Sequence, residues 1–354
     1  TSYQEESLTL AQVEKDDYVI YLEESKLNLD EVVLSANRWE QDKRDIPIKI
    51  EQISLKEARL YNPQTAADLL GTSGEVYIQK SQMGGGSPMI RGFSTNRVLL
   101  VVDGVRMNTA IFREGNVQNV LALDPFATQN TEVIFGPGSV IYGSDAIGGV
   151  MDFHTLDAGT SPNELSYLYG HGAYRYSSAN NEHTFHGDIR LKNDHWGFVT
   201  SFTQSKFGDL HMGSEGSDVL LRPSYQDRIN GADTVLTNED PERQVSSGYE
   251  QWNFMQKLIY EPGEHWDLTY SFHYSESGDV PRYDRLIETE DDGTFSSAEW
   301  YYGPQRWIMH HLRARLKQST AIYDEARFTA AYQHFEESRH DRKWGSDLLR
   351  ERFE

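Results

Sequence analysis

The sequence WDLTYSFHYS, residues 266–275, alternates apolar and polar side chains without a break. In an extended strand this alternation places every second side chain on the same face. The pattern recurs after residue 163 in further long runs, which contain Phe185, Trp196, Ile308 and Phe328. Ordinary strands average about five or six residues, whereas a strand that crosses a membrane needs about 9–11. The chain is therefore predicted to contain an antiparallel sheet of unusually long strands.

The connections between these predicted strands differ in length. Residues 192–195 and 261–264 read as tight turns, while residues 208–247 and 277–303 are long, acidic and rich in glycine. Short turns at one end and long loops at the other are typical of outer-membrane barrels. Four tryptophans near strand ends fit the aromatic girdles of such barrels: Trp196, Trp252, Trp266 and Trp307. A soluble β-sandwich, whose strands also alternate, is the competing interpretation.

The composition restricts the classes of function. Acidic residues outnumber basic ones 55 to 33, and the formal net charge of −22 disfavours nucleic-acid binding because phosphates would be repelled. Cysteine is absent, which excludes a disulfide scaffold, a thiolate metal site and a cysteine nucleophile. No catalytic triad, phosphate-binding loop or metal-ligand spacing stands out in the sequence. We therefore expect no enzyme, no cofactor and no metal site.

Residues 46–157 follow a different pattern, with short elements separated by many glycines. Strands are predicted at residues 76–78, 98–102 and 132–135. A helix is predicted from Asn62-Pro63, as N-cap and first helical residue, to Gly71. This region is expected to be a compact α+β domain.

The number of long strands limits how the two regions can fit together. Seven are predicted after residue 163, or eight if residues 347–353 form another. A barrel of eight strands is filled by its own side chains, whereas about 22 strands enclose a lumen wide enough for a domain. We therefore expect an α+β plug followed by roughly the first third of an antiparallel transmembrane β-barrel.

At this point several short motifs together resemble those of TonB-dependent outer-membrane receptors. They occur in the expected order at Asp30–Ala36, Ile90–Phe93, Val101–Arg106, Thr131–Pro137 and Tyr142–Val150. The resemblance implies four parts along the chain. These are the end of a carboxypeptidase-regulatory-like β domain (residues 1–28), a TonB box with its linker (29–45), the plug (46–157) and the first part of the barrel (163–354).

The resemblance assigns the first motif to TonB binding. An extended, β-prone segment flanked by charges can add as a strand to the sheet edge of a partner. The expected contact residues are Asp30, Glu31, Val32, Val33, Leu34, Ser35 and Ala36. The implied partner is TonB with its energising complex in the inner membrane. A passive linker is the alternative interpretation.

A second implied feature is an ionic lock between plug and barrel. In the family an arginine beside glycine pairs with barrel glutamates, and here Arg91 takes that place, with Glu132 in the later motif. A second arginine usually precedes the later Gly-Pro, but Phe135 stands there. Arg91 would otherwise be an ordinary solvated charge.

Plug loops that face outward in this family contact the ligand. The candidates for this contact are Met83, Gly84, Ser94, Thr95, Phe112 and Arg113, although Phe112 fits the plug core equally well. Such a set could bind a large, flat or anionic ligand.

The expected function is TonB-dependent import across the outer membrane of a Gram-negative bacterium. An iron chelate, haem or a ferric siderophore, is the first expectation for the ligand. Cobalamin, another metal chelate or an oligosaccharide are alternatives within transport. A β-sandwich adhesin or binding protein is the alternative from another class. Besides TonB and the ligand, outer-membrane lipid is an expected partner.

Overall fold

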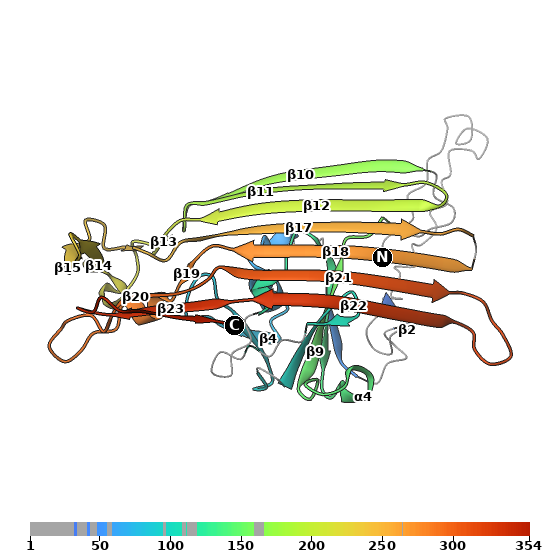
Figure 1. Cartoon of the computed structure of the whole chain (residues 1–354), viewed down its shortest axis with the longest axis horizontal. Helices are drawn as coiled ribbons and strands as arrows, with labels where there is room; N and C mark the ends of the chain where they lie inside the picture. Colours follow the sequence, from blue (N-terminus) through green and yellow to red (C-terminus); the bar gives the residue numbers. More distant parts are fainter. Residues whose placement is uncertain are drawn as a thin grey trace, which may run out of the picture.

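The computed structural model of the chain describes residues 32–33, 41–42, 48–54, 59–94, 97–107, 111, 119–158, 166–263 and 265–354. Figure 1 shows two parts, a mixed α+β body and a sheet of long strands that lies across one side of it. We call residues 48–158 the plug and the long-stranded sheet the wall.

The plug is built on a five-stranded sheet with the order β3-β8-β9-β6-β7. Strands β6 and β9 pair in parallel, and the other pairs are antiparallel. Both faces of β6 are covered, because Leu99 and Val101 pack into one apolar cluster while Leu100 and Val102 pack into another. The strands are β3 (Ile50–Ser54), β6 (Val98–Val102), β7 (Val105–Arg106), β8 (Thr128–Phe135) and β9 (Gly149–Thr155).

The other elements before the wall are short. They are β1 (Val32–Val33), β2 (Gln41–Asp42), α3 (Ala66–Gly71), β4 (Val76–Gln79), β5 (Ser87–Ile90), η3 (Asn119–Ala122) and α4 (Ser139–Tyr142). In the part of the chain that the structure describes, no helix is long and apolar enough to cross a membrane.

Helix α3 ends at Gly71 as predicted, but the predicted start at Asn62-Pro63 is wrong. Thr65 is the N-cap: its side chain accepts the Asp68 N–H, and the Asp68 carboxylate accepts the Thr65 N–H. This reciprocal capping satisfies two donors that a helix start otherwise leaves open. Asn62 has a φ of +50°, which is incompatible with a helical start.

The wall consists of seven antiparallel strands in sequence order, each of 11 or 12 residues. Their length confirms the prediction from the alternating pattern. The two long connections, after β12 and after β18, lie at the same end of the wall (Figure 1), where the chain also makes the short turn between β10 and β11. The strands are β10 (Tyr167–Ser177), β11 (Glu182–Lys192), β12 (Trp196–Phe207), β17 (Tyr249–Tyr260), β18 (Trp266–Ser277), β21 (Gln305–Leu316) and β22 (Ala326–Glu336).

The wall has polar side chains on its inner face and apolar side chains on its outer face. On β11, for example, Thr184 and Asp188 are buried toward the plug, whereas Phe185 and Ile189 are exposed. A soluble sandwich would bury its apolar face instead, so this polarity favours a barrel in lipid.

Three of the four predicted girdle tryptophans are exposed, but Trp307 is not. Its exposed fraction is 3%, and it belongs to the same buried apolar cluster as Val102 and Met107 of the plug. The reason is the strand period of two, which puts Trp307 on the same inward face as Met309 and His311. The assignment of Trp307 to a girdle was therefore wrong.

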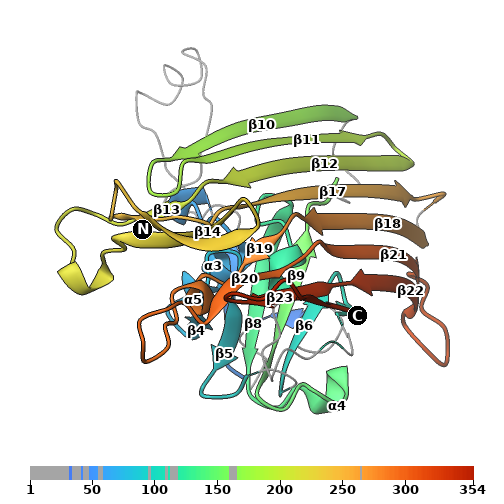
Figure 2. The ribbon, with the colours of Figure 1, turned by 60° about the vertical axis from the view of Figure 1, so that its left-hand side comes forward.

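The two long connections are folded. Loop A, residues 208–248, contains β13 (Leu210–His211), η4 (Asp218–Leu220), β14 (Ser224–Ile229), β15 (Ala232–Thr237) and β16 (Arg243–Gln244). Loop B, residues 278–304, contains β19 (Val280–Pro281), α5 (Tyr283–Leu286) and β20 (Ser297–Tyr302). Figure 2 shows loop B lying next to the end of the plug hairpin β4–β5.

The predicted eighth wall strand does not join the wall. It belongs to the outer layer, by which we mean loops A and B together with the strands that pair with them. The chain leaves β22 and continues as β23 (Ser338–Lys343) and β24 (Leu349–Phe353). These two strands form a four-stranded sheet with β19 and β20. Residues 347–353 thus supply a strand, but it extends the outer loops because β23 pairs with β20 of loop B.

Candidate functional site between plug and wall

A buried ion pair joins the plug to the middle of the wall. The dipeptide Asp103-Gly104 makes the turn between β6 and β7, with φ of 48° and 81°, as expected for a tight hairpin turn. This turn directs the Asp103 carboxylate to Lys257 of β17, at an Oδ2–Nζ distance of 2.9 Å. The Lys257 ammonium also donates to the Thr155 carbonyl, at 3.3 Å.

The Asp103 carboxylate is stabilised in its charged form. Burial alone would raise the pKa of Asp103, but Lys257, His273 and two hydrogen bonds from Thr155 hold this pKa well below its usual range. The Thr155 N–H and hydroxyl donate to the carboxylate at 2.9 and 2.6 Å. The Asp103 carboxylate therefore stays charged in this contact between plug and wall.

A second polar contact holds the segment before α3. Arg175 of β10 donates to Glu182 of β11 at 2.6 Å and to the Pro63 carbonyl at 2.8 Å. The Gln64 side chain donates to the same Glu182 carboxylate. This use of residues 62–64 by the wall accounts for their departure from helical geometry.

Three further hydrogen bonds connect the two parts. Gln251 donates to the Leu121 carbonyl at 2.6 Å, and Gln333 donates to the Arg106 carbonyl at 2.8 Å. Thr203 donates to the Asp124 carboxylate at 2.6 Å. Much of the plug–wall junction therefore consists of polar contacts, and hydrogen bonds to water can take the place of such contacts.

The two residues predicted to form the ionic lock lie within the plug. Arg91 is exposed, and its guanidinium lies 5.4 Å from the centre of the Phe135 ring. Glu132 is fully buried, 3.6 Å from His154 Nε2. Their role in a lock stays a prediction.

The sequence analysis missed Asp103 and Lys257, although the inward position of Lys257 on an alternating strand was a usable signal.

Glu132, Asp152 and His154 form a buried charge cluster in the plug sheet. Glu132 and Asp152 are directly opposite each other on β8 and β9. Burial raises the pKa of Asp152 to about 6. Burial would lower the pKa of His154, but the carboxylates of Asp152 and Glu132 outweigh it and raise this pKa to about 9.

We expect this cluster to make the full-length receptor less stable as the pH rises from 6.5 to 9. The folded pKa of His154 exceeds its usual value, so its stabilisation is complete below pH 6.5 and is lost through pH 9, by at most about 3 kcal/mol. Thermal unfolding across this range measures the slope. His154→Gln should flatten it, and an equal slope in both proteins would contradict the assignment.

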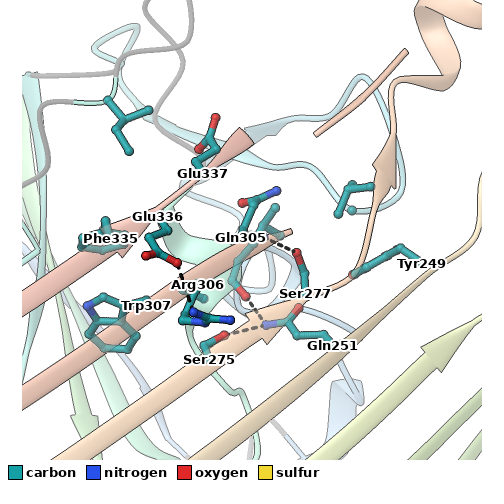
Figure 3. Close-up of a pocket in the computed structure, with 15 residues that line it drawn as sticks. Tyr249, Gln251, Ser275, Ser277, Gln305, Arg306, Trp307, Phe335, Glu336 and Glu337 are labelled. Carbon is teal, nitrogen blue, oxygen red and sulfur yellow. Dashed lines mark hydrogen bonds and ion pairs between the residues drawn. The ribbon is translucent and has the colours of Figure 1, made fainter. Parts of the chain in front are cut away.

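A pocket lies at the long-loop end of the junction, with a cavity volume of about 30 Å³. The wall contributes aromatic rings, amides, hydroxyls and the Arg306–Glu336 ion pair at 3.1 Å. The Gln251 side chain donates to Ser275 at 3.3 Å, and the Gln305 N–H donates to Ser277 at 3.4 Å (Figure 3). The plug closes the pocket from below with Gly84, Ile111, Leu121 and Ala122.

Two of the predicted ligand-contact residues lie at or beside this pocket. Gly84 lines it, and a Cβ at this position would lie 2.5 Å from Val280 of loop B, so only glycine permits the close approach. Met83 packs half-buried against the neighbouring cluster of Phe207, Tyr249, Val280 and Tyr302.

Of the other four predicted ligand-contact residues, the structure describes Ser94 alone. Ser94 is half-buried and does not line the pocket. Thr95, Phe112 and Arg113 lie outside the described residues, although Ile111 lines the pocket. The ligand-contact assignments therefore stay predictions.

The proposed TonB box is described only in part. Val32 and Val33 pair with Asp42 and Gln41 in a short antiparallel ladder. Asp30, Glu31, Leu34, Ser35 and Ala36 lie outside the described residues, as do residues 1–28. The described pair has the extended backbone that strand addition needs.

Among the residues that the structure describes, two groups of side chains have the composition of a metal site, which the sequence analysis did not anticipate. The first is His171, His186 and Asp188 on the inner face of the wall. Sheet register brings it together, because His171 is directly opposite Asp188. Arg190 lies 2.9 Å from Asp188, which opposes a cation there. The second group is His211, Asp240 and Glu242 in loop A.

Comparisons with known proteins agree with this architecture. Residues 42–150 match the TonB-dependent receptor plug domain. The chain is 37% identical over 152 residues to the vitamin B12 transporter BtuB of Vibrio vulnificus, which covers 42% of this chain and 24% of that protein. It is 29% identical over 182 residues to a hemin receptor of Yersinia pestis, covering 51% of this chain and 26% of the relative.

A solved structure shares the fold. The copper transporter OprC superimposes with a TM-score of 0.59 at 15% sequence identity, over 82% of this chain and 37% of that protein. The chain spans about a quarter of the length of the two curated relatives above. Residues 42–150 therefore belong to the TonB-dependent receptor plug domain, and the polar inner face of the wall and these relatives support a TonB-dependent receptor, a family whose members are not enzymes.

Proposed function

We propose that this chain forms part of a TonB-coupled importer of a scarce metal chelate in the outer membrane of a Gram-negative bacterium. The observation that carries the proposal is the pocket, because plug and wall build it together. A metal chelate is far larger than this cavity of about 30 Å³, so only one edge of the ligand would enter it, where it contacts both the fixed wall and the part that must move. Its binding energy can therefore shift the position of the plug.

The coupling we propose runs from the pocket to residues 30–36. Ligand binding disturbs the hydrogen bond from Gln251 of the wall to the Leu121 carbonyl of the plug, because both residues line the pocket. The plug then rearranges against the wall, and the TonB box becomes available for strand addition to TonB. Force from TonB breaks the remaining polar contacts and opens a path. Two sites coupled through one rearranging element are the minimum that such transport requires.

Two classes of chelate are candidates for the ligand. An iron chelate, haem or a siderophore, was the expectation from the sequence, and one relative is a hemin receptor. A vitamin B12 transporter matches at higher identity. The hydroxyl and amide groups of Ser275, Gln251 and Gln305 suit a ligand with many hydrogen-bonding groups.

The charge of loops A and B favours cobalamin over haem. Loop A has eight acidic and three basic residues, and loop B has seven and two, a net of −5 in each. Acidic loops around a binding site repel anions on approach. Haem carries two propionates, whereas the side chains around the corrin ring of cobalamin are amides. We therefore put cobalamin ahead of haem.

Uptake measurements with the full-length receptor test the function. We expect a bacterial strain that lacks its own receptors to accumulate labelled cyanocobalamin when it expresses this protein. Accumulation of haem or a ferric siderophore instead would support import but overturn the order of ligands. Failure to accumulate any of the three would contradict metal-chelate import.

A pocket variant tests where the ligand binds. Gln305→Ala removes an amide from the pocket wall, and losing one hydrogen bond to the ligand should weaken binding by up to about tenfold. Quenching of tryptophan fluorescence measures the affinity. Gln204→Ala, on the opposite face of β12 from the plug, is the control and should bind as the wild type does. Equal affinity of all three proteins would place the ligand elsewhere.

A further inference from the structure

We propose that loop A binds a divalent transition-metal ion through His211, Asp240 and Glu242. This proposal does not depend on the transported ligand, because the three side chains lie outside the pocket between plug and wall. It names a separate site on the long-loop side of the wall, with one imidazole and two carboxylates as ligands.

The three side chains converge on a common point. His211 Nε2 lies 2.9 Å from Asp240 Oδ2 and 3.9 Å from Glu242 Oε2. The possible ligand atoms all lie within 4.8 Å of one another. Zinc ligands stand about 2.0–2.2 Å from the ion, so small side-chain rotations bring all three atoms into range. The remaining coordination positions are left for water.

The orientation of the imidazole ring favours a metal. His211 Nδ1 lies 2.9 Å from the backbone carbonyl of Met212. A carbonyl only accepts, so Nδ1 carries the hydrogen and, in the neutral ring, the Nε2 lone pair faces the carboxylates. A histidine ligand held by a carbonyl on its other nitrogen is the usual second layer of a metal site.

The backbone around the ligands is braced. Asn238 is buried, and its amide donates to the carbonyls of Arg222 and Arg243 at 2.8 and 2.9 Å while its oxygen accepts the Asp240 N–H at 3.2 Å. The Met212 N–H donates to the Glu242 carbonyl at 3.0 Å. The backbone of two of the proposed ligands, Asp240 and Glu242, is thus held in place by hydrogen bonds. A metal site needs this kind of preorganisation.

The charges around the site also favour a cation. Loop A has a net charge of −5. The basic residue that follows Glu242, Arg243, is directed to Asp209, with Nη2 2.7 Å from its carboxylate. Imidazole with carboxylates suits Zn²⁺ or a similar ion, whereas Ca²⁺ and Mg²⁺ prefer oxygen ligands alone. The group on the inner wall lacks this advantage because Arg190 holds its carboxylate.

Calorimetric titration of the untagged full-length receptor with Zn²⁺ tests the proposal. We expect one saturable site per chain. His211→Ala and Glu242→Gln should each weaken the affinity by about tenfold or more, as even outer partners of metal sites do. Co²⁺ in place of Zn²⁺ should give an absorption band that both variants lose.

Glu242→Gln is the deciding variant. A simple ion pair between His211 and Asp240 would not need Glu242, which lies 3.9 Å from the ring. His334→Ala is the matched control, because His334 also lies 3.0 Å from a carboxylate, that of Glu336, on a wall strand. It should bind Zn²⁺ as the wild type does. Absence of saturable binding, or binding that survives both loop variants, would overturn the proposal.

Discussion

Replacing Lys257 with methionine in the full-length receptor should destabilise the junction between plug and wall by about 3–5 kcal/mol. The change leaves the Asp103 carboxylate buried without the ammonium that lies 2.9 Å from it. Such a carboxylate must either stay charged in a poor environment or take up a proton, and both cost free energy. Denaturant unfolding of the purified receptor measures the loss.

The same variant should also make the plug easier to displace. The Asp103 turn and Thr155 are held to β17 through Lys257, so losing this contact loosens the end of the plug sheet at the wall. We expect more frequent ion-conducting openings in planar bilayers than the wild type gives. Such openings would distinguish a plug that is easier to displace from a barrel that is merely less stable.

Two further variants make the test specific. Asp103→Asn combined with Lys257→Met removes both charges, and the double variant should recover most of the lost stability because no unpaired charge remains. Lys206→Met changes an exposed lysine on β12 and should have little effect. If the double variant were as unstable as the single one, the ion pair would not be the cause.

Deletion of residues 30–36 should reduce uptake to background while ligand affinity stays unchanged. The proposed strand addition to TonB depends on this segment, and none of the described residues that line the pocket belongs to it. Uptake and binding must both be measured in the same membranes, since a receptor that failed to insert would lose both. Continued energy-dependent uptake by the deletion variant would refute the role of the segment.

A point substitution can distinguish strand addition from a mere need for length. Val33→Pro removes a backbone N–H from the extended pair at Val32–Val33, and proline cannot donate to a ladder. We expect Val33→Pro to import far less than the wild type. Val33→Thr keeps the N–H and the preference for strands, so it should import normally. Equal uptake by both would mean that backbone pairing is not the means of contact.

The agreement between sequence and structure was best where the signal is local. The alternation of residues 266–275 and its repeats predicted the long strands and the division of their side chains between two faces, because side-chain direction depends only on the strand period. The errors arose where a signal was not followed through or where two signals competed. Trp307 was placed outward although its position in the alternation is inward, and Thr65 replaced Asn62 as the cap because its partner Asp68 completes a reciprocal pair.

The predicted eighth strand shows a different limit. Residues 349–353 are a strand, as their composition indicated, but they pair with β23 in the outer layer. Strand pairing depends on which edge is free when the chain arrives, and no local pattern records that. The same holds for the metal group in loop A, whose histidine is 29 residues from Asp240.

From the sequence alone followed the long alternating strands, the order of plug and wall and the motifs of the family, because each is encoded in neighbouring residues. Only the tertiary structure decided that Asp103 meets Lys257, that Arg175 holds residues 62–64, and that Gly84 lies beneath loop B. These contacts join parts far apart in the chain, and their partners depend on how the plug docks against the inner face of the wall. The alternating pattern of a strand shows which charged side chains point inward. The oppositely charged partner of such a side chain becomes known only when the position of the plug against the wall is known.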